Sequence, residues 1–300
     1  LKRILVVESA ATTNVVLFGG STSRELTSWD AHVSQVLSRK AGRNIRFTNS
    51  GWRNQTLPTI WNITEQLDHS KKHLVILGMN YYRLTESNYI FKKNVQQSVI
   101  PIPTSRSLLL SQLPWLNLVP KAEPFHTESL LNRFKHSLFT PVDIGARETR
   151  TGQQLRVKNP FQGPQNYYHQ PVFTQDRKVR RINTFYATRG PQLFFNQSES
   201  QRLWSKYISL YHKRGITFLI LVLPFDPGMN TYRHTLEPYF AEALAEFQRK
   251  GALVYDLREI SQMESTDFYD QQHLIASGRE KIFARLTEVI ASTIVGMYEN

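Results

Sequence analysis

The sequence predicts a three-layer α/β/α sandwich built around a parallel, five-stranded sheet. Short apolar runs of strand length alternate with longer stretches in which apolar residues recur every three or four positions. The connections are short over residues 14–80, which is typical of a doubly wound sheet with right-handed crossovers. A chain of 300 residues with 40% hydrophobic content can bury a core of this size.

Five apolar runs are expected to form the strands, because each has the length and the β-branched content of a buried strand. They are residues 15–18, 45–48, 73–77, 216–223 and 253–256. A further short apolar piece at 4–7 is expected to be a helix that leads into the first strand.

Helical periodicity fills the intervals between these strands. The first helix carries Val33 and Leu37 and ends at Gly42, a common helix stop. Pro58 suits the first turn of the second helix. Ser198–Gln201 fits a capping box that opens a third helix. The last two helices are expected at 236–250 and from 277 to about 297.

Residues 81–197 interrupt this alternation. The segment is rich in proline and aromatic residues, and only pieces such as 129–137 have a helical pattern. A loop of this length is unusual in a compact domain unless it is functional. We therefore expect one domain, residues 1–300, with an insertion at 81–197 that forms a lid or substrate platform. The alternative is a partly disordered excursion.

The bulk composition restricts the possible partners and cofactors. A net charge of +13 favours an anionic partner or surface, although no nucleic-acid-binding motif occurs and no nucleic-acid partner is expected. The absence of cysteine excludes disulfides and thiolate sites. The histidines lack metal-ligand spacing, so neither a metal nor an organic cofactor is expected. The basic run 177–181 is interpreted as a solvated loop, the usual role of such runs.

A candidate nucleophile follows the first expected strand. Residues 15–18 break into Gly19-Gly20, and Ser21 comes next. In open α/β sheets, functional groups gather at the carboxyl ends of the strands. The two glycines permit a sharp turn, which would let the hydroxyl and amide of Ser21 face a substrate. Strand, glycine and serine in this order also describe an ordinary turn, so the candidate needs partners.

The partners are expected between the last strand and the last helix. Asp270 and His273 lie three residues apart, at the edge of the sheet where Ser21 is expected. A serine nucleophile needs a base that takes its proton and a carboxylate that orients the imidazole. Asp226, after the fourth strand, could also line the site, but loop aspartates mostly serve turns.

Donors for an oxyanion are available on two further loops. Gly51 offers an unhindered amide, Asn80 offers a side-chain amide, and the Ser21 amide would be a third donor. Trp52 and Arg53 flank the proposed glycine and are candidates for substrate contact, although Trp52 could equally serve packing.

Together these four blocks resemble the SGNH (GDSL-like) hydrolase superfamily, named for Ser, Gly, Asn and His in that order. The blocks read Gly-Gly-Ser21-Thr-Ser, Asn49-Ser-Gly51, Gly78-Met-Asn80 and Asp270-Gln-Gln-His273. The resemblance implies a flavodoxin-like sheet and a Ser–His–Asp triad of Ser21, His273 and Asp270. It also implies an oxyanion hole of Ser21, Gly51 and Asn80.

Two positions depart from the family pattern, since Gly20 and Tyr81 stand where aspartate is usual. The last block looks most like extracytoplasmic members, including D-alanyl-transfer and polysaccharide O-acetylation proteins. The resemblance therefore implies an esterase or O-acyltransferase acting on an acylated cell-envelope glycan or anionic polymer. A membrane-bound acyl-transfer partner and an N-terminal anchor outside this sequence are further expectations. The alternative is a non-catalytic envelope protein that binds an anionic polymer.

Overall fold

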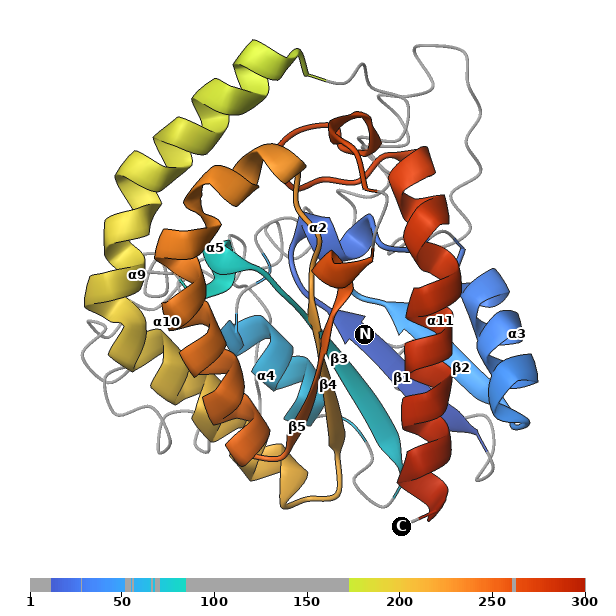
Figure 1. The fold of residues 1–300 in the computed structure, drawn as a ribbon. Coiled ribbons are helices and arrows are strands. Elements are labelled where there is room, and N and C mark those ends of the chain that lie inside the picture. Colours follow the sequence, from blue (N-terminus) through green and yellow to red (C-terminus); the bar gives the residue numbers. More distant parts are fainter. Residues whose placement is uncertain are drawn as a thin grey trace, which may run out of the picture.

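A computed structural model of the chain describes residues 12–27, 29–51, 55, 57–65, 67, 71–84, 173–260 and 263–299. The expected helix at 4–7 and the helical piece at 129–137 lie outside these residues, as do Trp52 and Arg53. Within the described residues, the chain folds as an α/β structure with helices on both faces of one sheet (Figure 1).

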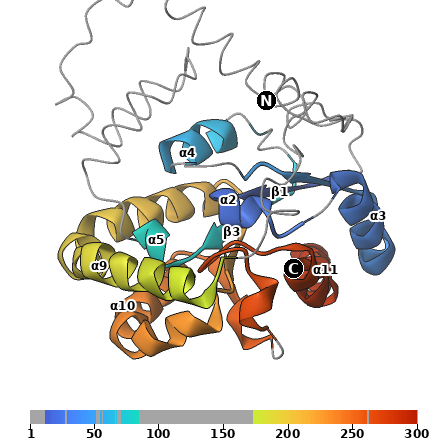
Figure 2. The ribbon, with the colours of Figure 1, turned by 90° about the horizontal axis from the view of Figure 1, so that it is seen from above.

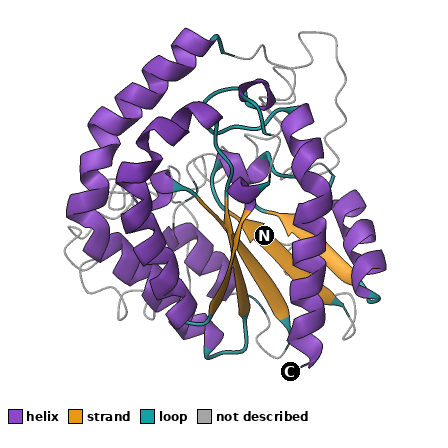
Figure 3. Ribbon diagram, viewed as in Figure 1, coloured by secondary structure: helices purple, strands orange, loops and turns teal. Residues whose placement is uncertain are grey.

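All five predicted strands are present and parallel. They are β1 (Thr13–Phe18), β2 (Ile45–Asn49), β3 (His73–Met79), β4 (Thr217–Val222) and β5 (Ala252–Asp256). Their order in the sheet is β2-β1-β3-β4-β5, and the sheet is visibly twisted (Figure 3). The predicted fold class is confirmed, because each strand pairs in parallel with its neighbours. Consequently, the carboxyl ends of all five strands meet at one edge of the sheet.

Helices cover the two faces of the sheet in separate groups. The longer ones are α3 (Asp30–Ala41), α4 (Leu57–Glu65), α9 (Gln175–His212), α10 (Asn230–Arg249) and α11 (Ala276–Glu299). The short helices α2 (Ser21–Arg24) and α5 (Tyr81–Leu84) directly follow β1 and β3. Seen from above, α3 and α11 lie together at the right, and α9 and α10 lie together at the left (Figure 2).

The alternation of side chains along β1 explains both layers. Val15 and Leu17 belong to the core under α3 and α11, whereas Val16 and Phe18 belong to the core under α4, α9 and α10. All four side chains are buried. Because successive strand residues point to opposite faces, a continuous apolar run is what a sheet covered on both sides requires.

The first two helices follow the sequence signals. Helix α3 ends at Gly42, whose φ of 64° is the left-handed conformation that glycine adopts without cost. Helix α4 has Pro58 as its second residue, and Ile60 and Ile63 are buried in the core. These boundaries are confirmed to within one or two residues.

The expected start of the third helix is wrong. Helix α9 begins at Gln175, so Ser198–Gln201 lies inside the helix and is not a capping box at its start. Propensity favours a start at that box, but the earlier residues are helical because Phe173 and Lys178 are anchored by tertiary contacts. At most residues 85–172 remain for the expected insertion, and these lie outside the described residues.

Close packing of glycines shapes the turn that follows β1. Gly19 has a φ of 148°, and a Cβ built on it would lie 1.8 Å from Ser23 Oγ. A Cβ on Gly78, in neighbouring β3, would lie 2.0 Å from the same oxygen. The side chain of Ser23 therefore occupies the space that both glycines leave empty, which fixes α2 against the sheet.

Substituting Gly78→Ala should lower the free energy of unfolding by about 1–3 kcal/mol, because the new methyl group overpacks against Ser23. Urea denaturation of the purified chain measures this change. The matched control is Gly296→Ala in α11, where a Cβ meets nothing within 4 Å and stability should stay the same or rise. Adding Ser23→Gly should recover part of the loss. A Gly78→Ala chain as stable as the parent would contradict the packing argument.

Candidate active site

The structure places Ser21 directly behind β1, as the sequence predicts. It is the first residue of α2, it follows the Gly19-Gly20 turn, and it is half-buried. The amides of Ser23 and Arg24 donate to the Gly20 carbonyl at 3.1 and 3.2 Å. This tight turn holds the serine at the carboxyl edge of the sheet.

Ser21, His273 and Asp270 form one chain of hydrogen bonds. Ser21 Oγ lies 2.7 Å from His273 Nε2, although 252 residues separate the two in sequence. On the other side of the ring, His273 Nδ1 lies 2.9 and 3.0 Å from the two carboxylate oxygens of Asp270. The carboxylate fixes the tautomer: Nδ1 carries the proton, and Nε2 can accept one from the serine.

Asp270 is held ionised by the groups around it. Burial tends to raise the pKa of its carboxyl, but bonds from His273 and from the amides of Gln272 and His273 lower it, with a net shift below the usual value. Both amides donate to Oδ1 at 3.0 Å. The Arg181 guanidinium lies 3.6 Å from Oδ2. An ionised aspartate in this place stabilises a protonated imidazole.

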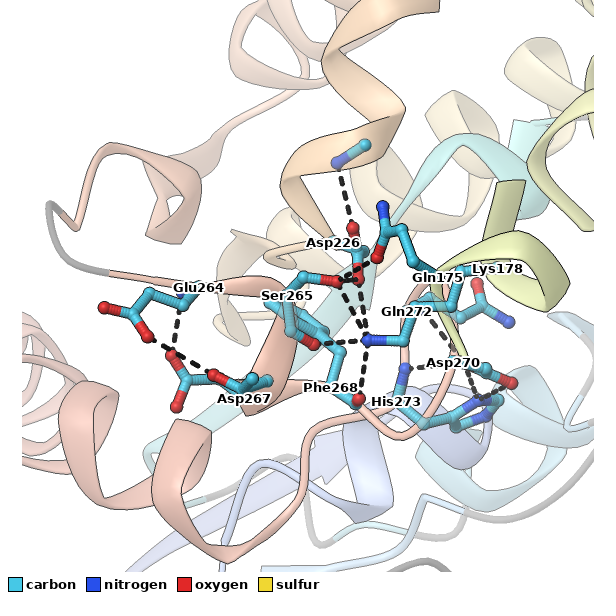
Figure 4. A network of polar contacts seen from close by, with 12 residues as sticks. Gln175, Lys178, Asp226, Glu264, Ser265, Asp267, Phe268, Asp270, Gln272 and His273 are labelled. Carbon is cyan, nitrogen blue, oxygen red and sulfur yellow. Dashed lines mark hydrogen bonds and ion pairs between the residues drawn. The ribbon is translucent and has the colours of Figure 1, made fainter. Parts of the chain in front are cut away.

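The loop at 264–275, which we call the acid–base loop, presents both residues. It opens with a short 3-10 turn, Ser265–Asp267, in which the side chains of Glu264 and Asp267 cap each other's backbone. The Tyr269 amide then donates to the His273 carbonyl at 2.7 Å, which closes a tight turn around Asp270. Figure 4 shows this loop and the polar groups that surround it.

Two of the three expected oxyanion donors, the Gly51 amide and the Asn80 side chain, lie at the same edge but are bonded to protein acceptors. The Gly51 amide donates to Asn49 Oδ1 at 3.0 Å. Asn80 Nδ2 donates to Gln272 Oε1 at 3.2 Å. A Cβ on Gly51 would lie 2.8 Å from the backbone nitrogen of Arg24, so only glycine fits against α2. An incoming oxyanion would have to compete with these two acceptors, so the donor role stays a prediction.

Gln55 supports the serine turn and was not identified from the sequence. Its side chain is fully buried, accepts from the Gly19 amide at 2.6 Å and donates to the Ser50 carbonyl at 2.9 Å. It thereby ties the turn after β1 to the loop after β2. No local pattern marks such a glutamine, because the Gly19 turn that it supports lies 36 residues away in sequence.

Glu25 is a second residue that sequence reasoning missed. It lies four residues after Ser21 with no exposed surface, and Arg24 donates to its Oε1. Burial raises the pKa of the Glu25 carboxyl, against a smaller lowering by Arg24. The Glu25 carbonyl accepts from Arg279 Nε at 3.1 Å, so α2 and the first turn of α11 are joined beside the acid–base loop.

The basic run 177–181 is not a solvated loop, as the sequence suggested, but part of the first two turns of α9. Lys178 in its middle is 1% exposed, and its ammonium contacts Asp226 Oδ2 at 2.9 Å. Arg177 and Arg181 remain exposed. A buried lysine cannot be distinguished from its exposed neighbours by composition, because only the tertiary partner makes its burial possible.

Asp226 does serve a turn, and it does more than that. Its Oδ1 accepts from the Gly228 amide at 2.9 Å and caps the 3-10 turn Pro227–Met229. Its Oδ2 accepts from Lys178 and from Ser265 Oγ. The loop after β4 is therefore bonded to both α9 and the acid–base loop.

The described part of the chain has no group of three or more His, Asp or Glu side chains that could hold a metal ion. None of its helices is both long and apolar enough to cross a membrane. The candidate substrate residues Trp52 and Arg53 are not among the described residues, so their role stays a prediction.

Comparisons with known proteins leave the family of the chain open. No protein-family model matches it, and no curated protein matches it. Among solved structures, the chain is similar to the lipase Lip_vut3 from a goat rumen metagenome, with 8% identity and a TM-score of 0.43. The alignment covers 93% of this chain and 96% of that one. The basis for a function is therefore the site itself.

Proposed function

We propose that this chain is a serine ester hydrolase or O-acyltransferase that works through Ser21, His273 and Asp270. The observation that carries the proposal is the hydrogen-bonded chain from Ser21 Oγ through both ring nitrogens of His273 to the Asp270 carboxylate. It joins a nucleophile, a base and an orienting acid in the order that acyl transfer requires.

The chemistry follows from these contacts. Ser21 Oγ attacks the ester carbonyl carbon while its proton passes to His273 Nε2, and Asp270 stabilises the resulting imidazolium. Nε2 then gives the proton to the departing alkoxide, and the acyl group stays on Ser21. Next, water or an acceptor hydroxyl loses a proton to Nε2, attacks the acyl carbon and releases the serine. Water makes the protein an esterase, and another hydroxyl makes it an acyltransferase.

The oxyanion formed in each step needs donors. We assign this role to the amides of Ser21 and Gly51 and to Asn80 Nδ2, which lie on the loops after β1, β2 and β3. Each such donor is typically worth about 3 kcal/mol in the transition state. Asn80 Oδ1 is buried without a hydrogen-bond partner among the described residues, so turning the amide away from Gln272 breaks no bond to Oδ1.

The proposed substrate is an acetyl or D-alanyl ester of a cell-envelope polysaccharide or anionic polymer outside the cytoplasm. The net charge of +13 supports an anionic substrate or surface. The resemblance of the four sequence blocks to extracytoplasmic SGNH-type proteins supports this substrate class and compartment. Trp52 and Arg53, which follow Gly51 in the sequence, would contact the substrate. The same resemblance supports a membrane-bound protein that supplies or accepts the acyl group.

A short-chain p-nitrophenyl ester and a fluorophosphonate probe test the proposed nucleophile and base. We expect hydrolysis and a single adduct on Ser21 in the wild type, and losses of at least about 10³-fold in Ser21→Ala and His273→Ala. Burst kinetics and intact mass measure these outcomes. The matched control is Ser292→Ala, an exposed serine on α11, which should behave as the wild type.

Two results would contradict the assignment. Ester turnover that is equal in the wild type and both site variants would show that another group does the chemistry. A wild type that neither turns over esters nor reacts with the probe, yet binds an anionic glycan as tightly as Ser21→Ala does, would favour the non-catalytic binding protein.

Asp270→Asn should lower ester turnover by about 10³- to 10⁴-fold, because an amide favours the wrong imidazole tautomer. It should also change the acid stability. The folded-state pKa of Asp270 lies below the ordinary 3.8, so its carboxylate stabilises the fold above that pH, and this contribution disappears as the pH falls below it. Thermal melts from pH 3 to 7 should show a higher melting temperature for the wild type than for Asp270→Asn near neutrality. This difference should shrink as the pH falls below about 4. A constant gap would contradict the lowered pKa.

A further inference from the structure

The acid–base loop depends on its neighbours for its position. Apart from the 3-10 turn Ser265–Asp267 and a single bridge between Phe268 and Leu274, it has no regular structure. Yet it must keep His273 within hydrogen-bond distance of Ser21, which belongs to a different part of the sheet edge. Displacement of a reacting group by about 1 Å can cost on the order of a hundredfold in rate. The contacts that hold this loop from outside therefore matter for the site.

Among the residues of α9, Lys178 makes the most contacts with this loop. Its ammonium donates to Ser265 Oγ and to the Phe268 carbonyl, both at 3.0 Å, and it also contacts the Ser265 carbonyl. Phe268 is two residues ahead of Asp270. Figure 4 shows the ammonium at the centre of this network, between the acid–base loop and Asp226.

Asp226 completes the attachment from the other side. It is fully buried and accepts from Lys178 at 2.9 Å and from Ser265 Oγ at 2.6 Å. Its backbone amide donates to the Gln271 carbonyl at 3.0 Å, within the turn between Asp270 and His273. The loop is thus bonded at three successive points, Ser265, Phe268 and Gln271, by one ion pair and its backbone.

Stability alone is a weak reason for such a pair. Removing two charges from water is expensive, and replacing a buried pair with apolar side chains of similar volume is often neutral or stabilising. Apolar side chains could not, however, bond the carbonyl oxygens of Ser265 and Phe268. What the ion pair adds over a packed apolar contact is therefore directional attachment of the acid–base loop.

We propose that Lys178 and Asp226 are positioning residues that hold the acid–base loop so that His273 meets Ser21, an inference that rests on the proposed function. They act through the backbone of the loop and do not contact the reacting atoms. The same attachment fixes the first turns of α9. From these turns Arg181 approaches Asp270. Just before the helix, the Phe173 amide donates to the Tyr269 carbonyl.

The test replaces the pair as a unit. Lys178→Met combined with Asp226→Leu removes both charges while keeping apolar volume, so no buried charge is left unpaired, which is the most costly outcome of a single substitution. The first measurement is the ¹H–¹⁵N signal of His273 Nδ1–H, assigned by its loss in His273→Gln. This signal reports the bond to Asp270 and needs no catalysis. We expect it to shift or broaden in the double variant.

The second measurement is the rate at which the fluorophosphonate probe labels Ser21 as a function of pH. We expect a loss of about tenfold to a hundredfold in the double variant and a displaced pH profile. The matched control is Arg214→Met, which breaks the ion pair between Arg214, in the turn after α9, and Glu65 of α4, away from the acid–base loop. It should lose stability and leave both readouts unchanged.

A folded double variant with the wild-type imidazole signal and labelling rate would overturn the proposal. If the double variant does not fold, Asp226→Asn decides with the same readouts: labelling slower than in the control supports positioning, and wild-type values overturn it. A wild type that the probe does not label would contradict the proposed function instead, while the imidazole signal still tests the positioning by itself.

Discussion

The hydrogen bond between Ser21 and His273 sets the main constraint on this molecule, because it joins residues 252 positions apart at 2.7 Å. Neither residue lies inside a strand, so each depends on a tight turn. The turn that carries Ser21 depends on Gly19 and Gly78, which leave space for the Ser23 side chain. It also depends on Gln55, in the loop after β2, which accepts a hydrogen bond from the Gly19 amide. A parallel sheet makes the meeting possible, since it brings the carboxyl ends of all its strands to one edge.

The charge of Asp270 is stabilised by the polar groups around its carboxylate. The Asp270 carboxylate accepts hydrogen bonds from two backbone amides and from the imidazole, and the Arg181 guanidinium lies 3.6 Å from its Oδ2. A cation beside this carboxylate favours its ionised form. Since Arg181 remains exposed, salt should weaken its interaction with the Asp270 carboxylate.

The sequence was sufficient for the features that depend on local patterns. Apolar runs such as Val15–Phe18 predict buried strands, and Gly42 marks a helix end, because period and turn chemistry are written in adjacent residues. The meeting of Ser21, His273 and Asp270 was also predictable, since the resemblance of the four blocks and the positions of the strand ends pointed to it, and their catalytic role stays a prediction. Gln55, Glu25 and Lys178 were not, because each has a partner that is distant in sequence and that no local pattern reveals.

The error at residues 177–181 shows why charge runs are ambiguous. Arg177, Arg180 and Arg181 are exposed, as composition suggests, and Lys178 alone turns inward. Helical geometry explains the difference, because residues one apart point about 100° away from each other and a single face of α9 meets the acid–base loop. A lysine can be buried there only because Asp226 and two carbonyl oxygens surround its ammonium. The buried Lys178 ammonium thus links α9, the loop after β4 and the acid–base loop that carries His273.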